Sequence, residues 1–294
     1  MNNGMNYIKR FLNAVLNILF WGSCFCVVLF LLQLFCFASF KIPSDSMEPT
    51  LRDGDFILVN KLVLGARLFD VSASLKNEEV PIYRLPAFGD LKRNDVLVFN
   101  FPYRKKWNYV HMDIMRYFVK RCIALPGDTL EIRSGLYEIR GCNDILGNRK
   151  AQLELADLED PGKWGIVTKT FPNDNRLDWN IREFGPLVIP KEGQCVLMND
   201  TSFLLYRQLV GWEQKKKMYL KGGKVLLGDS VIHEYRFLKN YYFVSGDKMA
   251  NSKDSRYWGM LPEDYIVGKA TRIWYSKNRN TDKTRWNRIM KKIE

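Results

Sequence analysis

Residues 12–40 form a continuous apolar stretch that contains no Asp, Glu, Lys, Arg or His. A helix needs about 20 apolar residues to cross a bilayer, so this stretch predicts a membrane-spanning anchor. Lys9 and Arg10 precede the stretch, and Lys41 follows it. Because cytoplasmic flanks carry an excess of Lys and Arg, we expect residues 1–11 to be a cytoplasmic tail and the rest of the chain to lie on the outer face.

A cleaved signal peptide is the competing interpretation of this stretch. The hydrophobic region of a signal peptide has about 7–15 residues, which is roughly half the length seen here. Phe40 also suits a cleavage site poorly, because such sites need small side chains. The length of the stretch therefore favours a retained anchor.

Beyond the anchor, short apolar runs bounded by turn residues predict a mainly β fold. Core strands are expected at residues 56–59, 95–99, 114–124, 241–244 and 265–274. Residues 61–91 are mixed in character and include Pro81, Pro86 and Gly89, so we expect them to form a loop with little regular structure. A catalytic β core is thus predicted at 41–128 and 241–275.

Between the two parts of this core, residues 129–240 have a different character. Short β-like runs at 130–132, 195–198 and 224–227 are separated by Gly, Asn, Asp and Pro. This pattern predicts an inserted β-rich subdomain. Because no long stretch after the anchor has helical periodicity, we expect long helices to be absent from the soluble part.

The charge of the chain is strongly basic. Its 294 residues include 45 Lys and Arg against 32 Asp and Glu, a formal net charge of +13. Such a balance suits either nucleic acid or an anionic membrane surface. The anchor favours the membrane, so the bilayer is the expected partner and nucleic acid is not.

The last segment, residues 276–294, carries seven Lys or Arg and is predicted to be a basic C-terminal tail. A solvated terminal segment is the usual structure of such a tail. Contact with the membrane surface is the alternative, with Trp286, Ile289 and Met290 available for it.

The six cysteines do not predict a disulfide framework. Three of them, Cys24, Cys26 and Cys36, lie in the apolar stretch, which leaves Cys122, Cys142 and Cys195. Three cysteines cannot pair completely. One bond, between Cys142 and Cys195 for example, stays open. No spacing is typical of a metal site, and we expect no metal or organic cofactor.

Ser46 is the candidate nucleophile, because it lies just after the anchor in a turn between Pro43 and Pro49. A serine hydroxyl is a weak nucleophile and needs a base. The two histidines, His111 and His233, have no recognisable catalytic context and are interpreted as ordinary surface or loop residues.

Lys120 is the alternative base. Strand alternation places it on the same face as Phe118 and Cys122, which are apolar neighbours able to exclude water from the amine. Full burial lowers a lysine pKa by roughly 3–5 units, which would leave a neutral amine able to accept the serine proton. The simpler interpretation is that Lys120 extends to solvent and Arg121 is a surface residue.

Four segments resemble, in order, the sequence boxes of bacterial type I signal peptidases. They are 43–51 (PSDSMEPTL), 93–99 (RNDVLVF), 120–128 (KRCIALPGD) and 246–259 (GDKMANSKDSRYWG). The likeness runs from the anchor to about Ala270, without the insertion. One box alone would be weak, but four in order behind an N-terminal anchor are highly specific.

The resemblance implies a role for each matching residue. Ser46 would be the nucleophile and Lys120 the general base. The backbone N–H of Ser46 and the hydroxyl of Ser44 would form the oxyanion hole. Ser252 would orient the Lys120 amine, while Asp254 and Arg256 would pair and order that loop.

The resemblance also implies shallow apolar pockets for small substrate side chains, lined by Phe40, Ile42, Pro43, Met47 and Val119, although plain core packing also explains these residues. Some positions depart from the family pattern without removing a catalytic group. They are Asn94, Tyr117, Ala124, Lys248 and Met249.

The expected function is that of a serine endopeptidase with a Ser–Lys dyad, which cleaves signal peptides from exported preproteins after A-x-A sites. It would be a single-pass protein of the bacterial cytoplasmic membrane, with a periplasmic catalytic domain, and the Sec translocon is a candidate partner. The alternatives are a dedicated peptidase of the same fold with one or few substrates and a non-catalytic envelope scaffold. The insertion could recognise substrate, contact the translocon or only fill space.

Overall fold

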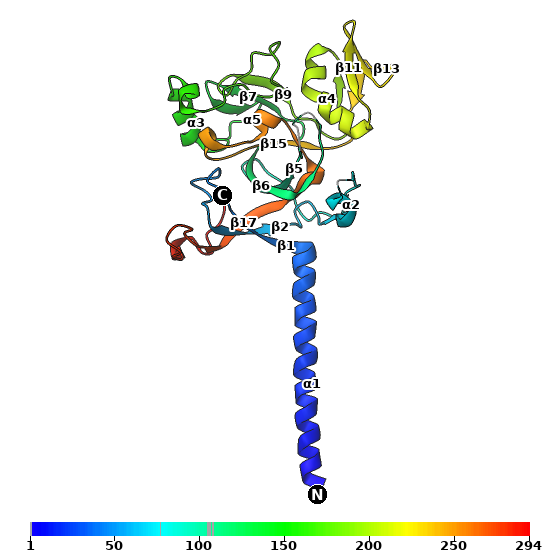
Figure 1. Cartoon of the computed structure of the whole chain (residues 1–294), viewed down its shortest axis with the longest axis vertical. Helices are drawn as coiled ribbons and strands as arrows, with labels where there is room; N and C mark the ends of the chain where they lie inside the picture. Colours follow the sequence, from blue (N-terminus) through cyan, green and yellow to red (C-terminus); the bar gives the residue numbers. More distant parts are fainter. Residues whose placement is uncertain (1, 77, 105–106, 108) are drawn as a thin grey trace.

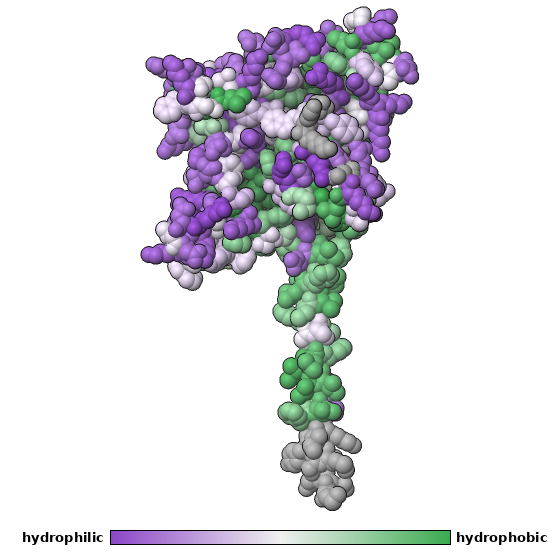
Figure 2. Space-filling model, viewed as in Figure 1, coloured by the Kyte–Doolittle hydropathy of each residue, from purple (hydrophilic) through white to green (hydrophobic). Residues whose placement is uncertain are grey.

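The computed structural model describes residues 2–76, 78–104, 107 and 109–294. Helix α1 (Asn2–Leu31) leaves the domain as an isolated rod and ends in a π-helical turn, Leu32–Cys36 (Figure 1). In the described part of the chain, Arg10–Cys36 is the single helix long and apolar enough to cross a membrane, and none of it is buried. Figure 2 shows it as an apolar column below a polar domain.

The helix agrees in length and composition with the predicted anchor, but the predicted end of the anchor is wrong. Residues 37–40 belong to strand β1 (Phe37–Lys41), which pairs with β2 (Asp55–Asn60). The chain therefore passes from the apolar helix to the sheet without a linker. This places Ser46 only ten positions after Cys36.

Seven strands form one antiparallel sheet in the order β1–β2–β17–β5–β6–β15–β16. The remaining members are β5 (Val96–Phe101), β6 (Asp113–Ala124), β15 (Tyr241–Ser245), β16 (Leu261–Pro262) and β17 (Ile266–Ser276). Each of the five predicted core strands is present within two residues of its predicted ends. The mainly β fold is thus confirmed.

The inserted segment contains short strands and two helices. Its elements are β7 (Thr129–Arg133), β8 (Leu136–Ile139), α3 (Arg149–Asp157), β9 (Phe184–Val188), β10 (Cys195–Leu197), α4 (Asp200–Gln214), β11 (Met218–Lys221), β12 (Lys224–Leu227), β13 (Ser230–Val231) and β14 (Glu234–Arg236), with a 3-10 turn at Pro161–Trp164.

The prediction that long helices are absent from the soluble part is wrong because of α4. This helix begins with a capping box, in which the side chains of Asn199 and Ser202 each bind the backbone N–H of the other residue. It buries Tyr206, Leu209 and Val210 against the rest of the insertion. Figure 1 places α4 and β11 at the end of the domain farthest from α1.

The loop at residues 61–91 is mostly irregular, as predicted. It contains three short elements, β3 (Arg67–Leu68), α2 (Val71–Leu75) and β4 (Tyr83–Arg84).

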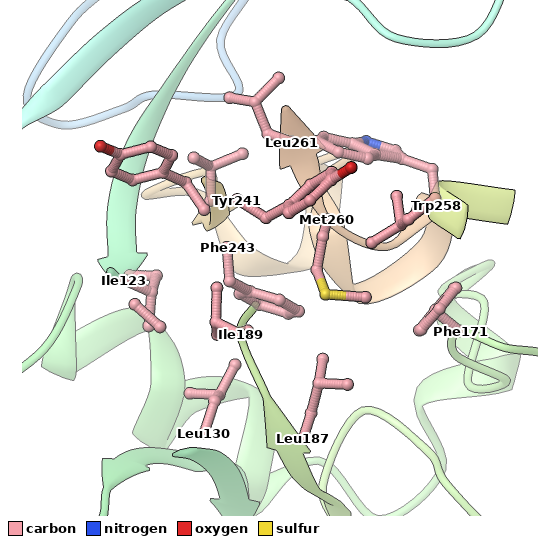
Figure 3. Close-up of a cluster of buried hydrophobic side chains, with 14 of the residues drawn as sticks. Ile123, Leu130, Phe171, Leu187, Ile189, Tyr241, Phe243, Trp258, Met260 and Leu261 are labelled. Atoms are coloured by element: carbon pink, nitrogen blue, oxygen red, sulfur yellow. The ribbon is translucent and has the colours of Figure 1, made fainter. Parts of the chain in front are cut away.

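One hydrophobic core joins the sheet to the insertion. Phe243 of β15 and Ile123 of β6 face Leu130, Leu187 and Ile189 of the inserted segment (Figure 3). All five side chains are completely buried. The insertion therefore shares a core with the sheet that carries the site, instead of folding around a core of its own.

The C-terminal segment packs on the sheet, so its interpretation as a solvated tail is wrong. The guanidinium of Arg288, in a 3-10 turn at Trp286–Arg288, donates to the buried carboxylate of Asp55 at 3.0 Å and to the carbonyl of Thr50 at 2.9 Å. Trp286 and Met290 stay exposed. The tail thus supports the start of β2 and the end of the loop that carries Ser46.

All six cysteines are free, so the open question of a Cys142–Cys195 bond is answered in the negative. Cys122 is buried in β6 and Cys195 is exposed.

Candidate active site

Ser46 and Lys120 lie in direct contact. Ser46 sits in the turn that follows β1, and Lys120 lies on β6, opposite Leu97 of β5. The Lys120 Nζ is 2.6 Å from the Ser46 Oγ, a hydrogen bond between residues 74 positions apart. The structure thus brings together the two residues expected to perform the chemistry.

The Lys120 amine is buried, with only 4% of the residue exposed. Burial lowers its pKa to about 8, while the carboxylates of Asp254, Asp247 and Asp45 oppose the shift. The ring of Phe118 lies 5.7 Å from Nζ and helps to exclude water. The simpler interpretation, in which this lysine extends to solvent, is therefore wrong. A neutral amine at this position can accept the serine proton.

The oxyanion hole expected at Ser44 and Ser46 has the necessary groups on one turn. The two hydroxyl oxygens are 3.4 Å apart. Among the residues that the structure describes, the N–H of Ser46 has no acceptor. That N–H is therefore available to a substrate oxygen, and the exposed Ser44 hydroxyl is a second donor close by.

Ser252 is buried beside the nucleophile, but its predicted hydrogen bond to Lys120 is not found. A Cβ atom built on Gly246 would lie 2.2 Å from the Ser252 Oγ and 2.6 Å from the Ser46 carbonyl oxygen, so both atoms pack on this glycine. The Ser252 hydroxyl is close enough to lower the pKa of Asp254, yet it makes no hydrogen bond of ordinary geometry in the described part of the chain. It is an unpartnered polar atom beside the site.

Asp254 and Arg256 form a completely buried ion pair. The guanidinium donates to both carboxylate oxygens at 2.9 Å. Arg256 also donates to the carbonyl of Met249, and Asp254 accepts from the N–H of Gly246. Burial raises the pKa of Asp254, but Arg256 outweighs it, so the pKa lies below its usual value. The pair fixes the loop that carries Ser252.

A second buried ion pair, between Arg121 and Asp247, was missed from the sequence. The guanidinium of Arg121 donates to both carboxylate oxygens of Asp247 at 2.7 Å. It also donates to the carbonyl of Asn94 and the hydroxyl of Thr50. The interpretation of Arg121 as a surface residue is wrong, because residues 120–124 of β6 are all buried and this end of the strand is covered on both faces. The available signal was a second basic residue within an apolar strand.

The expected pocket residues divide into two groups. Ile42 and Met47 belong to a small core that also contains side chains of β2, β5 and β17, and they are only 2% and 1% exposed. Phe40 and Val119 are half-buried on that core, and Pro43 is exposed. Ile42 and Met47 thus form the buried base of the expected pocket, whereas Phe40, Val119 and Pro43 are accessible above it.

Tyr117, a position that departs from the family pattern, lies beside this apolar surface. Its ring centroid is 5.0 Å from that of Phe40, so β1 and β6 approach each other at this point. The two histidines take no part in the contact with Ser46. His111 adjoins Tyr103, and burial lowers its pKa. No group of three or more potential metal ligands occurs among the described residues.

Comparisons with known proteins match most of the chain to one protein family. The family described as "Signal peptidase, peptidase S26" matches residues 15–275. Signal peptidase I of Pseudomonas aeruginosa is 32% identical over 87% of this chain and 72% of its own length. Signal peptidase I of Buchnera aphidicola from Schizaphis graminum is 29% identical over 85% of this chain and 71% of its own length. Signal peptidase I of Helicobacter pylori is 27% identical over 91% of this chain and 90% of its own length.

Proposed function

This chain belongs to the signal peptidase (peptidase S26) family, and we propose that Ser46 and Lys120 are its catalytic dyad. The protein is a signal peptidase I, a serine endopeptidase that removes signal peptides from preproteins. The observation that carries the assignment of the dyad is the 2.6 Å contact between a buried lysine amine and the serine hydroxyl.

In the proposed reaction, neutral Lys120 takes the proton of Ser46 as the serine oxygen attacks the scissile carbonyl. The resulting oxyanion accepts hydrogen bonds from the Ser46 N–H and the Ser44 hydroxyl. Lys120 then gives its proton to the leaving amine, which becomes the N-terminus of the mature protein. The signal peptide remains as an ester on Ser46 until a water molecule, deprotonated by Lys120, hydrolyses it.

The preprotein is proposed to bind as an added strand between β1 and β6. Among the described residues, β1 pairs only with β2, and β6 pairs only with β5 up to Lys120. Each strand therefore offers one free edge for main-chain hydrogen bonds. Alternate side chains of an added strand face the same way, which suits the two small residues of an A-x-A site on the Phe40–Val119 surface.

Helix α1 is proposed to span the bacterial cytoplasmic membrane, with the N-terminal tail in the cytoplasm and the catalytic domain on the periplasmic side. The absence of a linker between α1 and β1 supports this proposal, because it keeps Ser46 close to the bilayer surface where a signal peptide ends. The bilayer and the Sec translocon are then the proposed neighbours of the enzyme.

The test is cleavage of a preprotein with an A-x-A site by the full-length chain in lipid vesicles, compared with Ser46→Ala and Lys120→Met. We expect cleavage by the unaltered chain and background rates for both variants, with Lys253→Met, an exposed lysine in the 246–256 loop, as the control. An unaltered chain as slow as Ser46→Ala would support a non-catalytic scaffold.

Substrate range needs a second measurement, the mapping of protein N-termini in cells depleted of this chain. Many uncleaved preproteins would indicate general signal-peptide processing. One or two would indicate a dedicated peptidase.

A further inference from the structure

A cluster of charged side chains joins the two loops that meet at Ser46. Lys248 donates from Nζ to the carboxylate of Asp45 and, at 3.4 Å, to that of Glu48. Asn251 donates from Nδ2 to both oxygens of the Asp45 carboxylate, at 3.1 and 3.2 Å. Asp45 and Glu48 lie on either side of Ser46, whereas Lys248 and Asn251 belong to the loop that carries Ser252.

The backbone of Lys248 reaches the nucleophile itself. Its N–H donates to the carbonyl of Ser46 at 3.1 Å. The peptide before Ser46 is held through the Asp45 side chain, and the peptide after it is held through this carbonyl. The first of these peptides carries the N–H expected to bind the oxyanion. A single residue, Lys248, therefore contacts both sides of the serine.

The energetics of this cluster indicate positioning more than stability. Asp45, Glu48 and Lys248 each keep 38–41% of their side chain exposed. Ion pairs with that exposure contribute little to folding stability, because water screens the charges. The hydrogen bond from Lys248 holds the pKa of Asp45 below its usual value, so Asp45 is charged throughout the neutral range.

We propose that Lys248 is a positioning residue, which sets the orientation of Ser46 relative to Lys120 by binding Asp45, Glu48 and the Ser46 carbonyl together. This inference rests on the proposed dyad. Lys248 departs from the family pattern, and in this chain it forms ion pairs with two carboxylates, Asp45 and Glu48, in the turn that carries Ser46. The three residues thus act as a unit, and its loss affects turnover more than substrate binding.

The first test compares Lys248→Met, which keeps the length of the side chain without its charge, with Lys248→Arg. Steady-state cleavage is measured with the full-length chain in vesicles. We expect Lys248→Met to lower kcat about tenfold with little change in KM, less than the roughly 10² attributed to a displacement of 1 Å. Lys248→Arg should recover most of the rate. Lys253→Met, on the same loop, should leave kcat unchanged.

The second test is a double-mutant cycle with Asp45→Asn/Glu48→Gln. If the three residues act as a unit, adding Lys248→Met to that variant should cost less than adding it to the unaltered chain. The pH profile gives an independent sign. The groups that face Lys120 include Asp45, Asp254, Asp247 and Arg256. Loss of Lys248 leaves the Asp45 charge unneutralised, which raises the pKa of Lys120 and moves the acid limb of the pH–rate profile to higher pH. Loss of the Asp45 charge moves that limb to lower pH.

Two results would overturn the proposal. One is an unchanged kcat and pH limb in Lys248→Met, and the other is full additivity in the cycle. If Lys248→Met does not fold, Lys248→Arg and the double carboxylate variant decide the question by the same kcat and pH measurements. Failure of the dyad looks different, because the unaltered chain would then cleave no faster than Ser46→Ala.

Discussion

The 246–256 loop is held at its back and at its front by contacts of different kinds. At the back, the inserted segment supplies a buried hydrogen bond from Tyr137 to Ser245, the residue before the loop, at 2.7 Å, and a partly buried one from Asn148 to the carbonyl of Asp247 at 3.1 Å. At the front, the half-exposed cluster around Lys248 joins the loop to Ser46. The buried contacts at the back therefore contribute to the stability of the loop, whereas the half-exposed contacts of Lys248 at the front orient it without contributing much stability.

This contrast explains what the insertion contributes. The backbone N–H of Phe171 donates to the carbonyl of Arg256 at 2.8 Å, and Tyr137 and Ser245 are both buried. Buried hydrogen bonds are costly to break, because the partner that remains cannot form a replacement hydrogen bond with water. The insertion thus packs against the loop that carries Ser252 and supports it through these hydrogen bonds.

The largest effect is expected from breaking the buried ion pair at the back of the loop. Asp254→Asn or Arg256→Met leaves one charge buried without its partner, which typically costs about 3–5 kcal/mol of folding free energy. Chemical denaturation of the full-length chain in detergent measures this loss. The double variant Asp254→Asn/Arg256→Met should lose less than the sum of the single losses. Additive losses would mean that the two groups do not compensate each other.

A smaller effect on stability, but a large one on rate, is expected from Gly246→Ala. Its methyl group would lie 2.2 Å from the Ser252 Oγ and 2.6 Å from the Ser46 carbonyl oxygen, so the serine must move. A displacement of about 1 Å at a reacting group costs on the order of 10² in rate. Gly89→Ala is the matched control, because its nearest neighbour is an ordinary contact at 3.9 Å. Equal cleavage rates for the two variants would contradict this geometry.

The pH dependence of cleavage and of stability tests Lys120, whose amine contacts Ser46. Lys120 must be neutral to act, so kcat/KM should fall about tenfold per unit below its pKa of about 8. The sign for stability follows from the same pKa. Between pH 8 and the ordinary lysine value of 10.5, the unfolded chain binds a proton that the folded chain does not, so stability rises with pH by about 1.4 kcal/mol per unit.

Lys120→Met isolates this contribution from other groups that titrate in the same range. Its stability should lack the rise that the unaltered chain shows between pH 8 and 10.5. Parallel stability curves for the two proteins would mean that the pKa of Lys120 is not lowered.

The sequence predicts those parts of the molecule whose signals are local. The strand at residues 114–124 follows from its apolar run, and the candidate site follows from four boxes in order. Arg121 was misjudged because strand alternation assumes that one face is open to water, whereas residues 120–124 of β6 are buried on both faces. Helix α4 was missed because its apolar residues lie in two short runs, 203–206 and 209–210, which also resemble buried strands. The docking of Arg288 on Asp55 joins residues 233 positions apart, and no local pattern indicates it.

The smallest effect tests the back of the loop alone. Tyr137→Phe removes the hydroxyl that donates to Ser245, and we expect a loss of about 1 kcal/mol in folding free energy. Tyr206→Phe removes a similar buried hydroxyl, which donates to the carbonyl of Val188 within the insertion and away from the loop. Both variants should lose similar stability, but only Tyr137→Phe should lower kcat, because only Tyr137 contacts the chain next to Gly246. An equal effect of the two variants on kcat would mean that the insertion stabilises the domain as a whole without positioning the loop.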